Sequence, residues 1–147
     1  MKKYHGSCHC KNFKYELNWP RNTKMVGRIC ECSFCSLHGA TWTSHSSAQT
    51  RIQIINREEM INYRFGHQTA EFHICATCGV VTTAIWKDDD RRLGVINIRT
   101  LEATPHKSIE NLPTCFDSET LVDRKKRRRA NWMPMYEAPS DSGQLKL

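Results

Sequence analysis

The residues of this 147-residue chain best suited to chemistry are its eight cysteines, most of which are closely spaced. They form three groups and one isolated residue: Cys8-His9-Cys10, Cys30-Glu31-Cys32-Ser33-Phe34-Cys35, Cys75-Ala76-Thr77-Cys78-Gly79 and Cys115. Thiolates at such short spacings are typical ligands of zinc. The pattern therefore predicts a zinc protein.

Two of the groups are pairs that suit one closed metal site. In an extended segment Cys8 and Cys10 would point to the same side. Cys75 and Cys78 bracket a tight turn, which Gly79 lets the chain complete without a Cβ clash. Together the pairs offer the four thiolates of a tetrahedral structural zinc. The spacing suggests that such an ion would tie the N-terminal strand to a segment 65 residues further along.

The middle group offers three thiolates, from Cys30, Cys32 and Cys35. Three protein ligands and an open position are typical of a reactive zinc site. His38, His45 or Cys115 could supply a fourth ligand and close the site, and the sequence leaves this open. It also identifies no general base, because His38, His45 and Glu31 are near in sequence and none stands out.

Other uses of the cysteines have less support. Disulfides suit a secreted protein, but residues 1–7 carry charge without the apolar stretch of a secretory signal. We therefore expect a cytoplasmic protein. A thioredoxin-like redox pair at Cys75 and Cys78 would need a flanking βαβ pattern that we do not find. An iron–sulfur cluster on the same thiolates is a further alternative.

The elements that hold the cysteines are predicted to be short strands in a mainly β, single-domain fold. Apolar residues alternate with polar ones, or are β-branched, in residues 13–17, 51–56, 71–74, 80–86 and 95–99. We predict no helix longer than about two turns, and residues 58–61 are the best candidate for one. No apolar run approaches the length of a membrane span.

Residues 118–147 are predicted to be a C-terminal extension of a zinc-binding domain formed by residues 1–117. Trp132 and Met133 should dock this extension partly onto the domain. The net charge of +7 falls to +1 without the basic run 124–129, so the basic character is local. The run is interpreted as a solvated face, and alternatively as a contact for phosphates or an acidic partner.

Four segments of the sequence resemble the glutathione-dependent formaldehyde-activating enzyme family, which includes centromere protein V. They are Gly6-Ser7-Cys8-His9-Cys10, the run Cys30 to Cys35 followed by Gly39, Phe72 with Cys75-Ala76-Thr77-Cys78-Gly79, and Val95 to Glu102. The resemblance covers roughly residues 4–104 and depends on the order and spacing of all three cysteine groups.

This resemblance implies a β-tent fold of antiparallel sheets pinned by two zinc ions. It implies a structural zinc at Cys8, Cys10, Cys75 and Cys78, and a catalytic zinc at Cys30, Cys32 and Cys35. The family's activity joins formaldehyde and glutathione into S-(hydroxymethyl)glutathione, and the enzyme is classed as a carbon–sulfur lyase. The implied partners are a glutathione-like thiol and an aldehyde, with no membrane and no nucleic acid expected.

The sequence departs from the family beside the middle group. Members often carry histidine at the position of Glu31 and basic residues at those of Ser36 and Leu37. A different thiol or aldehyde is therefore an alternative substrate. A non-enzymatic zinc-stabilised module that contacts an acidic partner or nucleic acid through residues 124–129 is the alternative function. The sequence leaves the oligomeric state open.

Overall fold

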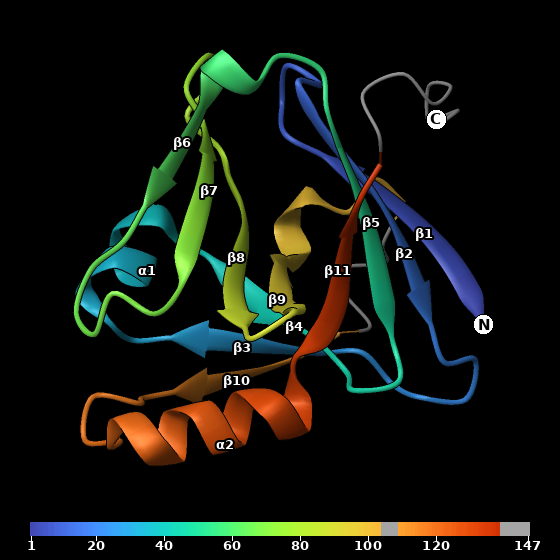
Figure 1. Cartoon of the computed structure of the whole chain (residues 1–147). Helices are drawn as coiled ribbons and strands as arrows, with labels where there is room; N and C mark the ends of the chain where they lie inside the picture. Colours follow the sequence, from blue (N-terminus) through green and yellow to red (C-terminus); the bar gives the residue numbers. More distant parts are fainter. Residues whose placement is uncertain (104–108, 139–147) are drawn as a thin grey trace.

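The computed structural model describes residues 1–103 and 109–138, many of which lie in short strands (Figure 1). The N-terminal part contains β1 (Lys2–Ser7), β2 (Phe13–Trp19), β3 (Val26–Cys30), α1 (Ser33–His38), β4 (Thr41–Thr43) and β5 (Gln49–Ile54). The middle part contains the 3-10 turn η1 (Arg57–Glu59), β6 (Met60–Tyr63), β7 (Glu71–Cys75), β8 (Val81–Asp88), β9 (Arg91–Asn97) and the 3-10 turn η2 (Ile98–Thr100). The C-terminal part contains β10 (Glu110–Thr114), α2 (Leu121–Asn131) and β11 (Met133–Glu137).

The strands form one branched sheet, which confirms the mainly β fold. The strand order is β1-β2-β5-β11-β9-β4-β3-β10, and β8, β7 and β6 continue in turn from β9. In Figure 1 the β1-β2-β5 side stands apart from the β6-β7-β8 side, with β11 between them. The expectation of antiparallel sheets is wrong at two of the described pairs, since β3–β10 and β5–β11 are parallel. Both pairs join strands far apart in sequence, as parallel neighbours require.

Strand β2 shows why the sequence forms this sheet. Phe13, Tyr15, Leu17 and Trp19 are all buried, while the residues between them are partly exposed. This alternation places one apolar face on the core, where burial of each large side chain contributes about 1.5–3 kcal/mol. The core has two clusters: one contains these residues with Cys8 and Cys75, and the other contains three tryptophans with Cys35. Each predicted metal site therefore borders its own part of the core.

Helix α2 corrects the expectation that no helix exceeds about two turns, because it spans 11 residues and contains the whole basic run. Thr120 caps it, with Oγ1 accepting from the backbone N–H of Asp123 at 3.1 Å. Ion pairs hold the helix in place, including those of Arg124 and Arg127 with Glu119. The apolar periodicity that identifies a helix is therefore weak here. The predicted turn of helix at 58–61 is also wrong, since η1 ends at Glu59 and β6 follows.

The C-terminal part of the chain contributes a strand to the middle of the sheet. β11 pairs with β5 on one side and with β9 on the other. Trp132 and Met133 are buried, as expected. The division of the chain after residue 117 stays a prediction, and residues 139–147 of the predicted extension lie outside the described residues. In the described part of the chain, no helix has the length and apolar character needed to cross a membrane.

Asp88 anchors α2 to the turn between β8 and β9. Its carboxylate accepts two hydrogen bonds from Arg129, at 2.8 and 2.9 Å, and one from Arg91 at 2.6 Å. These contacts lower the pKa of Asp88 to about 2, and the hydrogen bonds from Arg129 have the largest effect. The ion pairs of Asp88 therefore stabilise the fold at pH values above 3.8, the ordinary pKa of the carboxyl group. This stabilisation is lost as the pH falls through about 2.

We expect Asp88→Asn to lower the free energy of unfolding by about 1–2 kcal/mol at pH 7, since both arginines are at least half exposed and solvent screens them. The difference from the wild type should shrink below pH 4 and nearly vanish at pH 2, as measured by urea unfolding across this range. Asp90→Asn, at an exposed position of the same turn, is the control. A difference that is independent of pH would contradict this assignment.

Candidate metal and ligand site

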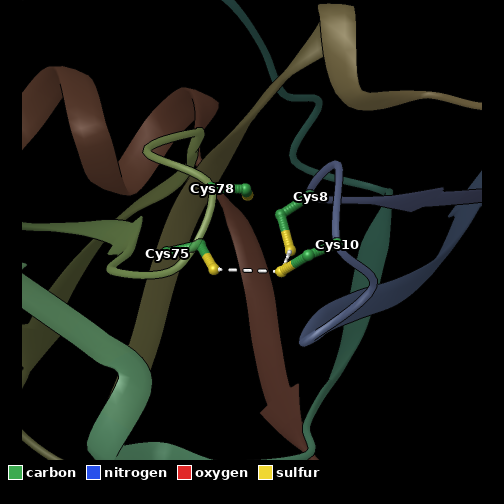
Figure 2. Close-up of side chains that lie close together, drawn as sticks. All are labelled: Cys8, Cys10, Cys75 and Cys78. Atoms are coloured by element: carbon green, nitrogen blue, oxygen red, sulfur yellow. Dashed lines mark hydrogen bonds between the residues drawn. The ribbon is translucent and has the colours of Figure 1, made fainter.

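The structure brings Cys8, Cys10, Cys75 and Cys78 together (Figure 2). The first two come from the loop between β1 and β2, Cys75 ends β7, and Cys78 lies in the turn that follows. The Sγ–Sγ distance is 3.7 Å between Cys8 and Cys10 and 3.4 Å between Cys10 and Cys75. All four sulfurs lie within 4.8 Å of one another.

This geometry fits a tetrahedral zinc ion. Sulfurs bonded to zinc at about 2.3 Å are about 3.8 Å apart at the corners of a tetrahedron. A disulfide would need about 2.05 Å between sulfurs, and all eight cysteines are free. The four-cysteine group could therefore hold a zinc ion with no backbone rearrangement.

Backbone turns place these sulfurs. The N–H of Cys8 donates to the carbonyl of Phe13 at 2.9 Å, and the N–H of Phe13 donates to the Cys8 sulfur at 3.3 Å. Cys8 and Cys10 thus converge through a turn rather than through the extended segment that we expected. Gly79 has a φ of +76°, which confirms its predicted role in the curl after Cys78.

The second group contains Cys30, Cys32 and Cys35, whose sulfurs also lie within 4.8 Å of one another. Cys30 ends β3, Cys32 is the N-cap of α1, and Cys35 is buried within that helix. The Cys32 sulfur accepts from the backbone N–H of Cys35 at 3.4 Å, and Trp42 Nε1 donates to the Cys35 sulfur at 3.2 Å. The end of a strand and the start of a helix therefore fix all three sulfurs.

The pKa values within each group diverge. A hydrogen bond from Cys35 lowers the pKa of Cys30 to about 6. The pKa of Cys35 is raised, mainly by the same hydrogen bond and also by burial of its thiol. Burial raises the pKa of Cys8 to about 12. For Cys78, burial is outweighed by the backbone N–H groups of Cys10 and Val80, which lower the pKa to about 6. Thiols must lose their protons to bind a metal, so a divalent cation that binds either group would release protons from its cysteines.

The described residues provide no fourth donor for the three-cysteine group. No histidine, cysteine or carboxylate among them lies within 4.8 Å of all three sulfurs. His38 packs on Phe34, with ring centroids 4.5 Å apart. His45 packs against Trp19 and accepts from the N–H of Ser47, and Cys115 is exposed. The position that we left open in the sequence is therefore not filled by His38, His45 or Cys115.

A cavity of about 640 Å³ adjoins the three-cysteine group. All three cysteines line it, together with the side chains of Trp42, Phe72 and Trp132. A cavity of this volume is large enough for a small organic ligand. The four-cysteine group does not line it. The two groups therefore differ in kind: one lies between two loops at the edge of the core, with Cys10 exposed, and the other opens onto a cavity.

The polar side of the cavity was not found by sequence reasoning. Arg28 of β3 and three arginines of α2 line it, as do His67 and Asp117. His38, His45 and Glu31, the candidate bases from the sequence, do not. The three arginines of α2 lie about 90 residues after the middle cysteine group in the sequence. Arg28 is close to that group but belongs to no motif of its own. The one signal that pointed to them was the charge of the run 124–129.

Comparison with known proteins adds three findings. The family model for the glutathione-dependent formaldehyde-activating enzyme matches residues 3–115. A crystal structure of a Rhodobacter sphaeroides protein is similar, with a TM-score of 0.58 and 27% sequence identity over 74% of this chain and 97% of that one. No curated protein matches the chain. The family match ends before α2 and β11.

Proposed function

Because the chain belongs to the glutathione-dependent formaldehyde-activating enzyme family, we propose that it joins a thiol and an aldehyde in the cavity beside Cys30, Cys32 and Cys35. The observation that supports this most directly is a three-sulfur group that has no fourth donor among the described residues and lines a cavity of about 640 Å³. Three ligands and an adjacent binding space are what a reactive metal site needs. We place the reaction in the cytoplasm, where thiols stay reduced.

We propose two zinc ions with different roles. Cys8, Cys10, Cys75 and Cys78 would hold a structural ion. Cys30, Cys32 and Cys35 would hold a second one, which when bound supplies a Lewis acid that favours the thiolate form of a substrate thiol or polarises an aldehyde oxygen. Because three thiolates already neutralise the charge of this ion, we expect its main contribution to be the positioning of the reactants.

The proposed reaction is an addition that needs no oxidant or reductant. The thiol sulfur forms a bond to the carbonyl carbon, and the π electron pair of the carbonyl moves to its oxygen. The proton released by the thiol is balanced by the proton that this oxygen takes up. With glutathione and formaldehyde the product is S-(hydroxymethyl)glutathione, and the reverse reaction cleaves the carbon–sulfur bond, as in a lyase.

Side chains of the cavity suit this addition. Trp42, Phe72 and Trp132 give it an apolar wall that limits water beside the reacting atoms. His67 lines the same cavity, and an imidazole nitrogen can take a proton from the thiol and return one to the oxygen near neutral pH. Thr69 and Ala70 follow it in the loop before β7 and also line the cavity. We assign His67 as the proton-transfer residue of this proposal.

The alternative, a binding module that uses the basic run, has less support. Arg124 and Arg127 pair with Glu119, and Arg129 pairs with Asp88. Arg128 is buried, with 7% of its surface exposed. Most of the run is therefore engaged within the protein instead of presenting a free basic surface.

The proposal is tested on the purified protein with glutathione and formaldehyde. We expect two zinc equivalents per chain by elemental analysis. We also expect S-(hydroxymethyl)glutathione to form, and exchange with its components, faster than in the uncatalysed mixture, as measured by exchange NMR. His67→Gln should keep both zinc ions and lower the catalysed rate. Two zinc ions with no acceleration for glutathione or for any other thiol and aldehyde tried would contradict the proposed reaction.

A further inference from the structure

Two arginines of the cavity lack a carboxylate partner in the described residues. Arg28, on β3 two residues before Cys30, donates from Nη2 to the Ser44 hydroxyl at 2.5 Å. Ser44 is neutral, and no described Asp or Glu oxygen lies within 4.0 Å of the Arg28 guanidinium. Partial burial of a cation beside a neutral hydroxyl costs free energy of desolvation, which an approaching anion would offset.

Arg128 is more deeply placed. It is 7% exposed, donates from Nη1 to the Thr69 hydroxyl at 2.8 Å, and lies over the Trp132 ring at 4.5 Å from its centroid. Its Nε is buried without a hydrogen-bond partner. Stacking on tryptophan holds the guanidinium plane, and Arg128 lines the cavity in this orientation. Burial lowers the pKa of Arg128 to about 10, so it remains a cation at neutral pH.

The neighbouring arginines differ from Arg28 and Arg128 because each of them has a carboxylate partner. Arg124 and Arg127 line the same cavity, but both form ion pairs with Glu119. Arg129, on the same helix and outside the cavity, is paired with Asp88. Asp117 also lines the cavity, yet forms no ion pair with Arg28 or Arg128 among the described residues. Arg28 and Arg128 therefore line the cavity without a carboxylate partner among the described residues.

We propose that Arg28 and Arg128 bind a carboxylate of the thiol substrate, and that α2 thereby sets the substrate specificity of the site. This rests on the proposed function and goes beyond it, because α2 lies outside the residues matched by the family model. The substrate class is a thiol that carries at least one carboxylate.

The arrangement suits such a molecule. The three sulfurs and the two arginines line one cavity of about 640 Å³, so a single ligand can reach both. A guanidinium offers two parallel N–H donors that match the two oxygens of a carboxylate. A neutral thiol of similar size would leave both cations unpaired, and a site built in this way discriminates strongly against it.

Binding is measured first, because it does not depend on turnover. S-methylglutathione keeps the carboxylates of glutathione and has a blocked sulfur, so titration calorimetry reports on the anion site alone. We expect Arg28→Gln and Arg128→Gln each to weaken its binding about ten- to a hundredfold, as for loss of a hydrogen bond to a charged group. Lys126→Gln is the matched control, since it removes one positive charge from an exposed position of the same helix.

Kinetics then separates this inference from the proposed function. We expect kcat/KM to be higher for 3-mercaptopropionate than for 2-mercaptoethanol, with the loss in Arg28→Gln appearing mainly in KM and confined to the carboxylated thiol. Thermal melting confirms the fold of each variant, and Arg28→Gln provides the test if the more buried Arg128 proves necessary for folding. Arginine-dependent binding without turnover would overturn the reaction and keep the anion site. Turnover that is indifferent to the arginines and to the carboxylate, or no binding of S-methylglutathione to the wild type, would overturn the anion site.

Discussion

Replacing Cys75 by serine is expected to remove one zinc equivalent and most of the folded population. Cys75 is fully buried at the end of β7, and its sulfur lies 3.4 Å from that of Cys10. Binding of a structural zinc by four thiolates contributes about 10–16 kcal/mol, which exceeds the net stability of a typical domain, about 5–15 kcal/mol. Loss of one buried ligand should therefore shift the chain toward the unfolded state.

The measurement pairs elemental analysis with circular dichroism during thermal unfolding. Cys115→Ser is the matched control, because it makes the same chemical change at an exposed cysteine outside both groups. We expect the control to keep both zinc ions and the wild-type melting temperature. A Cys75→Ser protein with wild-type metal content and melting temperature would show that the four sulfurs hold no structural ion.

Cys32→Ser is expected to lower kcat/KM about a thousandfold while leaving the fold intact. Cys32 is the N-cap of α1, and its side chain accepts from the backbone N–H of Cys35. Serine is itself a favourable N-cap, so the helix should start at the same residue. What is lost is one of the three ligands of the proposed ion, and the positioning of reactants that such an ion provides can contribute several kcal/mol.

This variant separates the two groups. We expect zinc content to fall from two to one, with a melting temperature within a few degrees of the wild type, since a surface cap contributes about 1 kcal/mol. The rate is measured with a carboxylated thiol and formaldehyde, beside Cys115→Ser. Full activity in Cys32→Ser would place the chemistry away from the three-cysteine group.

Much of the fold and both cysteine groups could be predicted from the sequence because their signals are local. Alternation of apolar residues identified β2, β5, β7, β8 and β9. The spacing of the cysteines suggested which sulfurs would meet, and the family resemblance implied it. The middle group appears in the structure with its three predicted members and with none of the suggested fourth ligands among the described residues.

The rest depends on contacts between distant residues. Helix α2 lacks an apolar stripe because ion pairs with Glu119 and Asp88 hold it, and such pairs leave no periodicity in the sequence. Arg28 and Arg128 are 100 residues apart in sequence, and both line the cavity because β3 and α2 flank it. The edge strand β1 has no apolar alternation because most of its residues are polar or charged, as is common where a strand faces solvent.

The position of β11 has a consequence for how the protein reaches its native state. Its partners β5 and β9 are made much earlier. Apart from an isolated bridge between Gly6 and Leu101, residues 133–137 join the β1-β2-β5 strands to the rest of the sheet in the described part of the chain. Until this segment is synthesised and inserted, two strand edges stay open side by side, where they can pair with another molecule. These pairings between distant segments give the fold a high contact order, so we expect folding to be slow.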